Sequence, residues 1–253
     1  MNLSTYFMHL VGSGISAYYF AAQIRDPKTR PNVLAGFQLA ESGSVPFLTA
    51  LSDRATAEGD TWLAEKLAQH ASDETKHGQI FAHALKQLNK EVIDFKNLPK
   101  NTQENKSENK SQERRSPFFA AFFEGYSQEQ LKPEVIDWDV FMGSTYILEL
   151  DASKDFTRMA NVLPENDPVT RNLKLGILSI AKDETGHAAY IYEAMMRRMP
   201  SANVERLVDE WRTRKTNAML AFAGNMLQRK NNSRSMVQDA ATTSETHSEV
   251  VAA

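Results

Sequence analysis

The sequence predicts an all-α protein whose centre is a four-helix bundle with one long crossover. Apolar residues recur at helical spacing over long segments, and no stretch shows sustained strand alternation. Pro and Gly stand between these segments, where they interrupt helices. Short links join the helices into two pairs. The much longer segment 89–133 separates the pairs and is enough chain to cross the length of a bundle.

The first pair of bundle helices is expected over 31–56 and 60–88. Pro31 suits the first turn of a helix, and Asp60 is placed to cap the N-terminus of the next one. The short connection favours antiparallel neighbours. The apolar segment 2–24 is expected to form an accessory helix that packs on the bundle.

The second pair is expected over 134–161 and 168–198. Asp167 and Pro168 form a start signal for the second of these helices, with Asp as the N-cap and Pro at the first helical position. A C-terminal accessory helix is expected over 202–229. These elements predict one helical domain with an accessory helix at each end.

Two polar segments are not expected to pack. Residues 100–116 are charged and repetitive, which predicts a flexible part of the crossover. Residues 231–253 read as a disordered tail. The expected single domain therefore covers 1–230.

The composition excludes several classes of protein. The 253 residues carry a net charge of −3, so no nucleic-acid surface is expected. The sequence contains no cysteine, which excludes disulfides, zinc ribbons and iron–sulfur clusters held by thiolates. Any metal site must therefore be built from His and carboxylates.

The N-terminal segment bears on location. Its first basic residue, Arg25, follows the apolar run, whereas a signal peptide carries its basic residues before that run. His9 and Ser13 interrupt the run, so a membrane span is not expected. The expected location is cytoplasmic.

One five-residue motif occurs twice, as DETKH at 73–77 and as DETGH at 183–187. In each copy a Glu and a His are three residues apart, which places both on one face of a helix. The face is an apolar stripe in both helices, so the motif should point into the core. Buried carboxylates need a positive partner, and a pair of metal ions would supply it. The candidate ligands are Glu74, His77, Glu184 and His187.

Further carboxylate ligands should come from the other helix of each pair. Glu41 lies in the middle of the apolar face of the helix 31–56. Glu149 lies on the apolar face of the helix 134–161, whereas Asp151 has the same spacing to the following motif as Glu41 has. Asp151 shares its face with Ser144 and Arg158, which reads as solvated. We therefore prefer Glu149, with Asp151 as the alternative.

This constellation resembles the ferritin-like di-iron carboxylate proteins, whose site takes one Glu from each of two helices and Glu-x-x-His from each of the other two. The resemblance covers about 31–198. It implies that Asp73 and Asp183, which precede the two motif Glu residues, accept hydrogen bonds from the ligand His residues across the bundle. One departure concerns the residue before each His. Many oxygen-activating members have Arg there, and this chain has Lys76 and Gly186.

Two further residues are candidates for the site. His70 lies one turn before Glu74 on the same face, as an extra ligand or as a core His hydrogen-bonded to a neighbour. We prefer the second reading, which makes His70 a supporting residue. Tyr146 lies one turn before Glu149 and is a candidate catalytic residue that carries a radical or donates a proton.

The resemblance implies an oxidoreductase with two Fe ions that activates O2 and oxidises a small or apolar organic substrate. The same ligands serve Mn or a mixed Fe/Mn pair. An external electron donor protein would be the partner, and a homodimer is compatible with this reading. Two alternatives are a rubrerythrin-like peroxidase or ferroxidase and a ferritin-type iron storage protein. A third is a metal-bound scaffold that binds a partner through its N-terminal helix.

Overall fold

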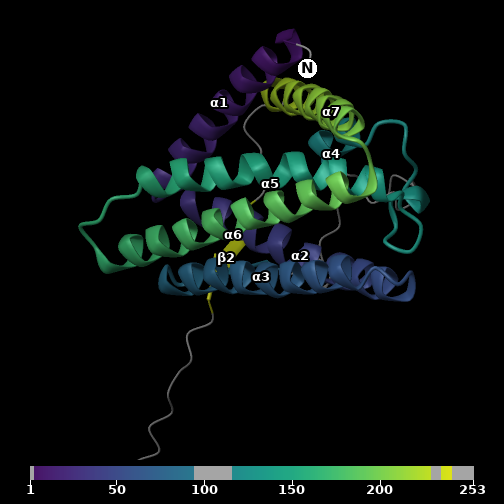
Figure 1. The fold of residues 1–253 in the computed structure, drawn as a ribbon. Helices are drawn as coiled ribbons and strands as arrows, with labels where there is room; N and C mark the ends of the chain where they lie inside the picture. Colours follow the sequence, from purple (N-terminus) through teal and green to yellow (C-terminus); the bar gives the residue numbers. More distant parts are fainter. Residues whose placement is uncertain (1–2, 94–115, 229–234, 241–253) are drawn as a thin grey trace, which may run out of the picture.

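The structure is a computed structural model, and it describes residues 3–93, 116–228 and 235–240 (Figure 1). Helices make up most of these residues, so the predicted all-α class is confirmed for them. The elements in chain order are α1 (Leu3–Arg25), α2 (Arg30–Ala57), α3 (Thr61–Gln87), β1 (Lys90–Val92), α4 (Pro117–Phe122), a 3-10 turn (Glu129–Leu131), α5 (Trp138–Asn161), α6 (Pro168–Arg198), α7 (Ser201–Gln228) and β2 (Val237–Asp239).

Two helix pairs form the central layers of the molecule. α2 packs along α3, α5 packs along α6, and α3 also contacts α6 between the pairs. In Figure 1 the α5/α6 pair lies above the α2/α3 pair, and α1 and α7 form a further layer above α5. The two predicted pairs are therefore present, and together they make a helical bundle.

The predicted caps start the helices as expected. The Asp60 side chain accepts a hydrogen bond of 3.0 Å from the Leu63 backbone N–H at the start of α3. The Asp167 side chain does the same for Thr170 at the start of α6, also at 3.0 Å. α5 begins at Trp138, later than the predicted 134, because the preceding residues form turns before Asp137 caps the helix.

The apolar core consists of two clusters, one on each side of the bundle midpoint. Along α3, Leu63 and Leu67 belong to the first cluster, and Phe81 belongs to the second. Along α6 the order is reversed, with Ile177 in the second cluster and Ile191 in the first. The DETKH and DETGH motifs therefore lie between two fully apolar regions.

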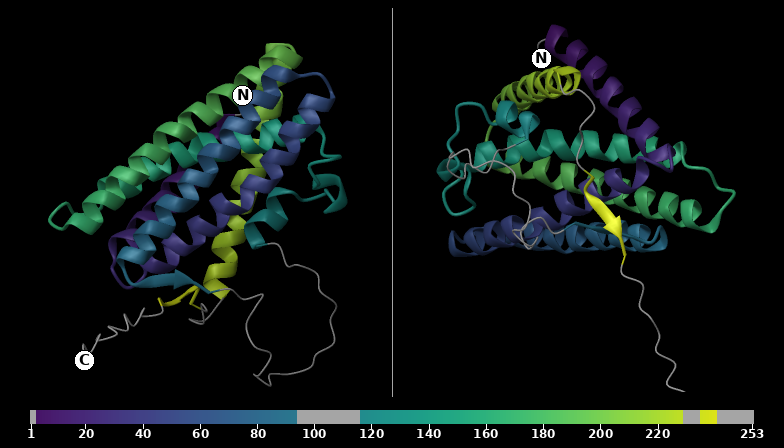
Figure 2. Two further views of the ribbon diagram at one scale, coloured as in Figure 1. Left: turned by 90° about the horizontal axis from the view of Figure 1, so that it is seen from below. Right: turned by 180° about the vertical axis from the view of Figure 1, so that it is seen from behind.

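The tail prediction was wrong for residues 235–240. Here β2 pairs antiparallel with β1 beside the end of the α2/α3 pair (Figure 2). The Asn32 side chain accepts a 2.9 Å hydrogen bond from the Met236 backbone N–H, and Ile93 donates one of 2.9 Å to the Met236 carbonyl. The remainder of the predicted tail, and all of the predicted flexible crossover segment except Ser116, lie outside the described residues.

The accessory helices cover the α5 side of the bundle. α1 contacts α2, α5 and α7, and α4 packs on α7 through Phe122 and Trp211, whose ring centroids are 5.1 Å apart. Among the described residues, no helix has both the length and the apolar character needed to cross a membrane.

Candidate metal centre

The structure brings all six predicted ligands together at the midpoint of the bundle, with His70 beside them. Their donor atoms form two groups, and within each group the atoms lie within 4.8 Å of one another. The groups share one residue, Glu74. The first group is His70, Glu74, Glu149 and His187, and the second is Glu41, Glu74, His77 and Glu184.

The second group converges on one nitrogen of His77. The Nδ1 atom lies 3.3 Å from Glu184 Oε1 and 3.6 Å from both Glu41 Oε2 and Glu74 Oε1. This nitrogen is buried and makes no hydrogen bond. Donor atoms that hold an ion at about 2.1 Å and at right angles lie about 3 Å apart. The observed spacing fits a metal ion, which would satisfy the unpaired nitrogen.

The first group is arranged around two imidazoles. His187 Nδ1 lies 3.3 Å from Glu184 Oε2, 3.9 Å from Glu74 Oε1 and 4.0 Å from Glu149 Oε2. His70 Nε2 lies 3.3 Å from Glu74 Oε1 and 3.5 Å from Glu149 Oε1. Glu149 is thus the carboxylate that α5 contributes to the cluster.

The buried carboxylates of the centre favour the binding of a positive charge. Burial, together with the neighbouring Glu184 carboxylate, raises the pKa of Glu149 to about 8. Burial likewise raises the pKa of Glu41 well above its ordinary value. Burial opposes the charged form of His77, but Glu184 and Glu41 outweigh it and raise the pKa of His77 to about 12. A proton is therefore held in this group, where a bound cation would relieve the same repulsion.

Two carboxylates support the imidazoles from outside the cluster. Asp183 Oδ2 of α6 lies 3.3 Å from His77 Nε2 of α3, a hydrogen bond across the bundle. Asp73 Oδ2 of α3 lies 3.6 Å from His187 Nε2 of α6, which is beyond hydrogen-bond length. Lys76 binds the other oxygen of Asp73 at 2.8 Å. Lys76, the residue directly before His77, thus holds this outer carboxylate.

Asp151 is not part of the cluster, and the prediction that it lies on a solvated face of α5 was wrong. The side chain is 4% exposed, and its Oδ2 lies 2.8 Å from both His9 Nε2 of α1 and Lys215 Nζ of α7. Ser13 donates a further hydrogen bond of 3.1 Å to the same oxygen. Burial opposes ionisation, but His9 and Lys215 hold the pKa of Asp151 below its ordinary value. The accessory helices α1 and α7 cover the face that looked open to solvent.

A tyrosine contacts the cluster, and it is not the predicted one. The hydroxyl of Tyr190 lies 2.8 Å from His70 Nδ1, and Tyr190 is 7% exposed. Tyr146 instead contacts Tyr192 at 5.5 Å between ring centroids, and its catalytic role stays a prediction. The available signal was the position of Tyr190, one turn after His187 on the inward stripe of α6.

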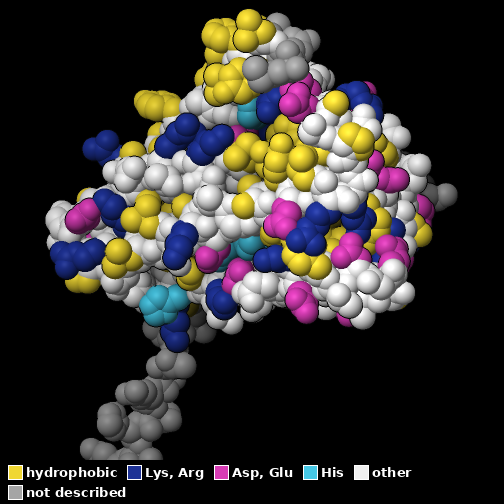
Figure 3. All heavy atoms as spheres, viewed as in Figure 1, with side chains coloured by type: hydrophobic (Ala, Val, Ile, Leu, Met, Phe, Trp, Pro, Cys, Tyr) yellow, Lys and Arg dark blue, Asp and Glu magenta, His cyan; other side chains and the backbone are white. Residues whose placement is uncertain are grey.

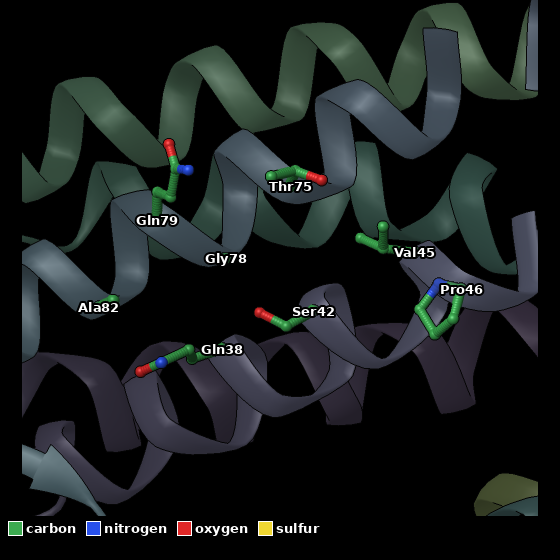
Figure 4. Close-up of a pocket in the computed structure, with 8 residues that line it drawn as sticks. All are labelled: Gln38, Ser42, Val45, Pro46, Thr75, Gly78, Gln79 and Ala82. Carbon is green, nitrogen blue, oxygen red and sulfur yellow. The ribbon is translucent and has the colours of Figure 1, made fainter. Parts of the chain in front are cut away.

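Two polar features beside the cluster were also not predicted. The Ser44 hydroxyl lies 3.0 Å from Glu74 Oε2 and 2.6 Å from the Glu41 carbonyl oxygen, so its single proton is shared between these two acceptors. An open groove of about 340 Å³ runs between α2 and α3 (Figure 4). Three of its lining residues each follow a candidate ligand directly in sequence: Ser42, Thr75 and Gly78. The candidate ligands themselves are not among the residues that line the groove.

A comparison of the chain with protein-family models, with curated proteins and with solved structures found no match. The function of the chain is therefore inferred from the geometry of the site. That geometry shows two adjoining clusters of His and Glu that could hold metal ions.

Proposed function

We propose that the chain is a ferritin-like di-iron carboxylate oxidoreductase, which uses O2 to oxidise a small or apolar organic substrate. One observation carries the proposal: two four-residue groups of His and Glu share Glu74 at the midpoint of a helical bundle. Four helices each supply at least one of these residues, in the pattern of the di-iron carboxylate site.

Each residue has a role that follows from its position. Glu74 belongs to both groups, so it would bridge the two ions, and the Ser44 hydroxyl lies beside its second oxygen. His77 and His187 would each bind one ion, with Asp183 and Asp73 behind them. Iron bound here would supply the exchange of electrons with O2.

The surroundings suit an oxidation that excludes bulk water. The two apolar core clusters enclose the centre along the bundle axis, so an apolar substrate has matching walls near it. In an oxygenation, one oxygen atom enters the substrate and the other leaves as water, which requires two protons and two further electrons. The chain has no cysteine for an iron–sulfur group, so an external donor protein is proposed to supply the electrons.

One observation favours a second candidate, a ferroxidase. The groove between α2 and α3 has no charged lining residue, and Gln38, Ser42, Thr75 and Gln79 contribute oxygen atoms to its otherwise apolar lining. Such a lining suits the passage of a hydrated cation, with iron as the substrate. The matching storage function would require many subunits around a cavity.

Metal analysis of the purified protein tests the proposal. About two irons per chain are expected, with an optical change when O2 meets the reduced form. Glu74→Ala and Glu184→Ala should each lower the metal content, whereas the control Glu65→Ala, on the exposed side of α3, should not. Unchanged metal content in both site variants would refute the ligand assignment. Far more than two irons per chain in a large assembly would identify a storage protein instead.

A further inference from the structure

The three imidazoles of the centre share one arrangement. In each, one ring nitrogen faces the carboxylate cluster and the other faces an oxygen outside it. For His77 that oxygen belongs to Asp183, at 3.3 Å, and for His187 it belongs to Asp73, at 3.6 Å. A ligand His is normally oriented in this way by an outer partner on its second nitrogen.

His70 repeats the arrangement with a phenol as its outer partner. Its Nδ1 lies 2.8 Å from the Tyr190 hydroxyl, and its Nε2 lies 3.3 Å from Glu74 and 3.5 Å from Glu149. If Nδ1 donates to the phenol oxygen, the lone pair of Nε2 points at the carboxylates. This is the tautomer that a metal ligand requires.

The ring of His70 packs on a second imidazole of the same group. It stacks on His187 with 3.7 Å between centroids and 25° between planes. The stack brings His70 Nε2 and His187 Nδ1 to the same two carboxylates, Glu74 and Glu149.

We infer that His70 is a seventh ligand, oriented by Tyr190, and that the two metal positions are therefore unequal. This inference rests on the proposed function. One position has two imidazoles and two carboxylates, and the other has one imidazole and three carboxylates. Imidazole suits iron better than manganese, and carboxylate suits both, so the His70 position should be the more selective for iron.

Anaerobic titration of the metal-free protein with Fe(II) alone tests this inference. The wild type should bind about two equivalents. His70→Gln keeps a hydrogen-bond donor for Glu74 but offers no imidazole, so it should weaken one of the two equivalents about 100-fold or more. Tyr190→Phe removes only the outer partner and should weaken the same equivalent about 10- to 100-fold. His83→Ala, an exposed imidazole on α3, is the control and should bind as the wild type does.

A second variant keeps the test independent of folding. His70→Gly leaves a cavity that added imidazole can fill, and imidazole should restore the lost equivalent. If His70→Gln binds two Fe(II) ions with wild-type affinity, His70 is only a hydrogen-bonded core residue and the inference fails. If the wild type itself binds no metal, the proposed function fails, which is a different result.

A separate observation concerns α1, whose exposed face carries large apolar side chains, whereas its buried residues are His9, Ser13, Ala17, Ala21 and Ile24. The buried residues facing α5 and α7 include His9, Ser13 and Ala17. The exposed residues are large and apolar, with 43% to 79% of their surface accessible, namely Leu3, Phe7, Met8, Leu10, Val11, Ile15 and Tyr18. At 100° per residue these seven share one side of the helix, opposite His9.

This apolar face of α1 has the features of an interface. Figure 3 shows hydrophobic side chains gathered at the top of the molecule, over the N-terminal part of α1. A standard interface buries about 800 Å² per partner and has an apolar centre surrounded by a polar rim. The seven large side chains would form that apolar centre.

We propose that this face binds the same face of a second copy of the chain. Residues 3–24 contain no Asp, Glu, Lys or Arg. An acidic or basic partner, or an anionic lipid surface, would find no opposite charge there. In a two-fold dimer the patch meets itself, and an uncharged patch does so without repulsion.

Light scattering coupled to size-exclusion chromatography tests the proposed dimer. The wild type should be a dimer, and the double variant Phe7→Glu, Ile15→Glu should be a monomer with unchanged helical circular dichroism. Leu175→Glu places the same charge on an exposed leucine of α6 and should remain a dimer. A monomeric wild type at all accessible concentrations would overturn the proposal. Flotation with phosphatidylserine vesicles that the double variant abolishes would also overturn it, by showing that lipid covers the face.

Discussion

Asp183 Oδ2 lies 3.3 Å from His77 Nε2, so the second copy of the repeated motif supports the imidazole of the first. The contact crosses from α6 to α3 and leaves His77 Nδ1 free to face the carboxylates of the second group. Asp73 faces His187 in the reciprocal contact at 3.6 Å. The Asp of each copy of the motif therefore faces the His of the other copy across the bundle.

Asp183→Asn should weaken metal binding about 10- to 100-fold, because the amide leaves His77 less basic and less firmly oriented. Competition with a chelator of known affinity measures the change. Glu193→Gln, on an exposed part of α6, is the matched control and should leave the affinity unchanged. An Asp183→Asn affinity equal to wild type would show that this contact does not support a ligand.

Asp151→Ala should lower the free energy of unfolding by about 3 to 5 kcal/mol, because it leaves the buried Lys215 and His9 without their carboxylate. Urea unfolding followed by circular dichroism gives the value. The double variant Asp151→Leu, Lys215→Met removes the pair together and should recover most of the loss. A cost below about 1 kcal/mol for Asp151→Ala would mean that α1 and α7 dock without this cluster.

The metal-free protein should lose stability as the pH rises from 6.5 to 8. The pKa of His77 is raised from 6.5 to about 12, and that of Glu149 from 4.5 to about 8. In this window the folded state holds protons that the unfolded state has released, so the free energy of unfolding falls with pH. Thermal unfolding across the window measures the slope, and Glu149→Gln should reduce it to the part that His77 contributes. A stability that rises with pH would contradict the prediction.

Gly143→Ala should destabilise the protein by about 1 to 3 kcal/mol, because α5 meets α7 too closely there for a side chain. A Cβ atom at this position would lie 2.2 Å from Cδ1 and 2.5 Å from Nε1 of Trp211, whose ring is buried. Gly43→Ala in α2 has open space, so it should be neutral or stabilising by about 0.5 to 1 kcal/mol. Equal melting temperatures for the two variants would show that Trp211 can move aside.

Helical periodicity was enough to find the candidate ligands, because each lies on an apolar stripe where a charged residue is conspicuous. Glu41 and Glu149 were chosen on that ground alone, and both lie in the cluster. Periodicity says which residues share a face of a helix, but it does not say what covers that face. Asp151 was therefore misread as solvated, since its partners His9 and Lys215 come from distant helices.

Two other features depend on contacts that the sequence pattern does not encode. Tyr190 reads as an ordinary core aromatic on the inward stripe of α6, and only its 2.8 Å distance from His70 gives it a role. β2 is a three-residue strand in a polar segment. It is held by β1 and by the Asn32 side chain, both distant in sequence.

The placement of the charged centre between two apolar clusters has a consequence for how the helices align. α3 and α6 pass through the two apolar clusters in opposite order. Apolar packing alone would tolerate a slide of one helix along the other. A slide of one turn, about 5.4 Å, would separate His77 on α3 from its 3.3 Å contacts with Glu184 and Asp183 on α6. The polar contacts of the repeated motif thus fix the position of α3 relative to α6 along the bundle axis, whether or not a cation is bound.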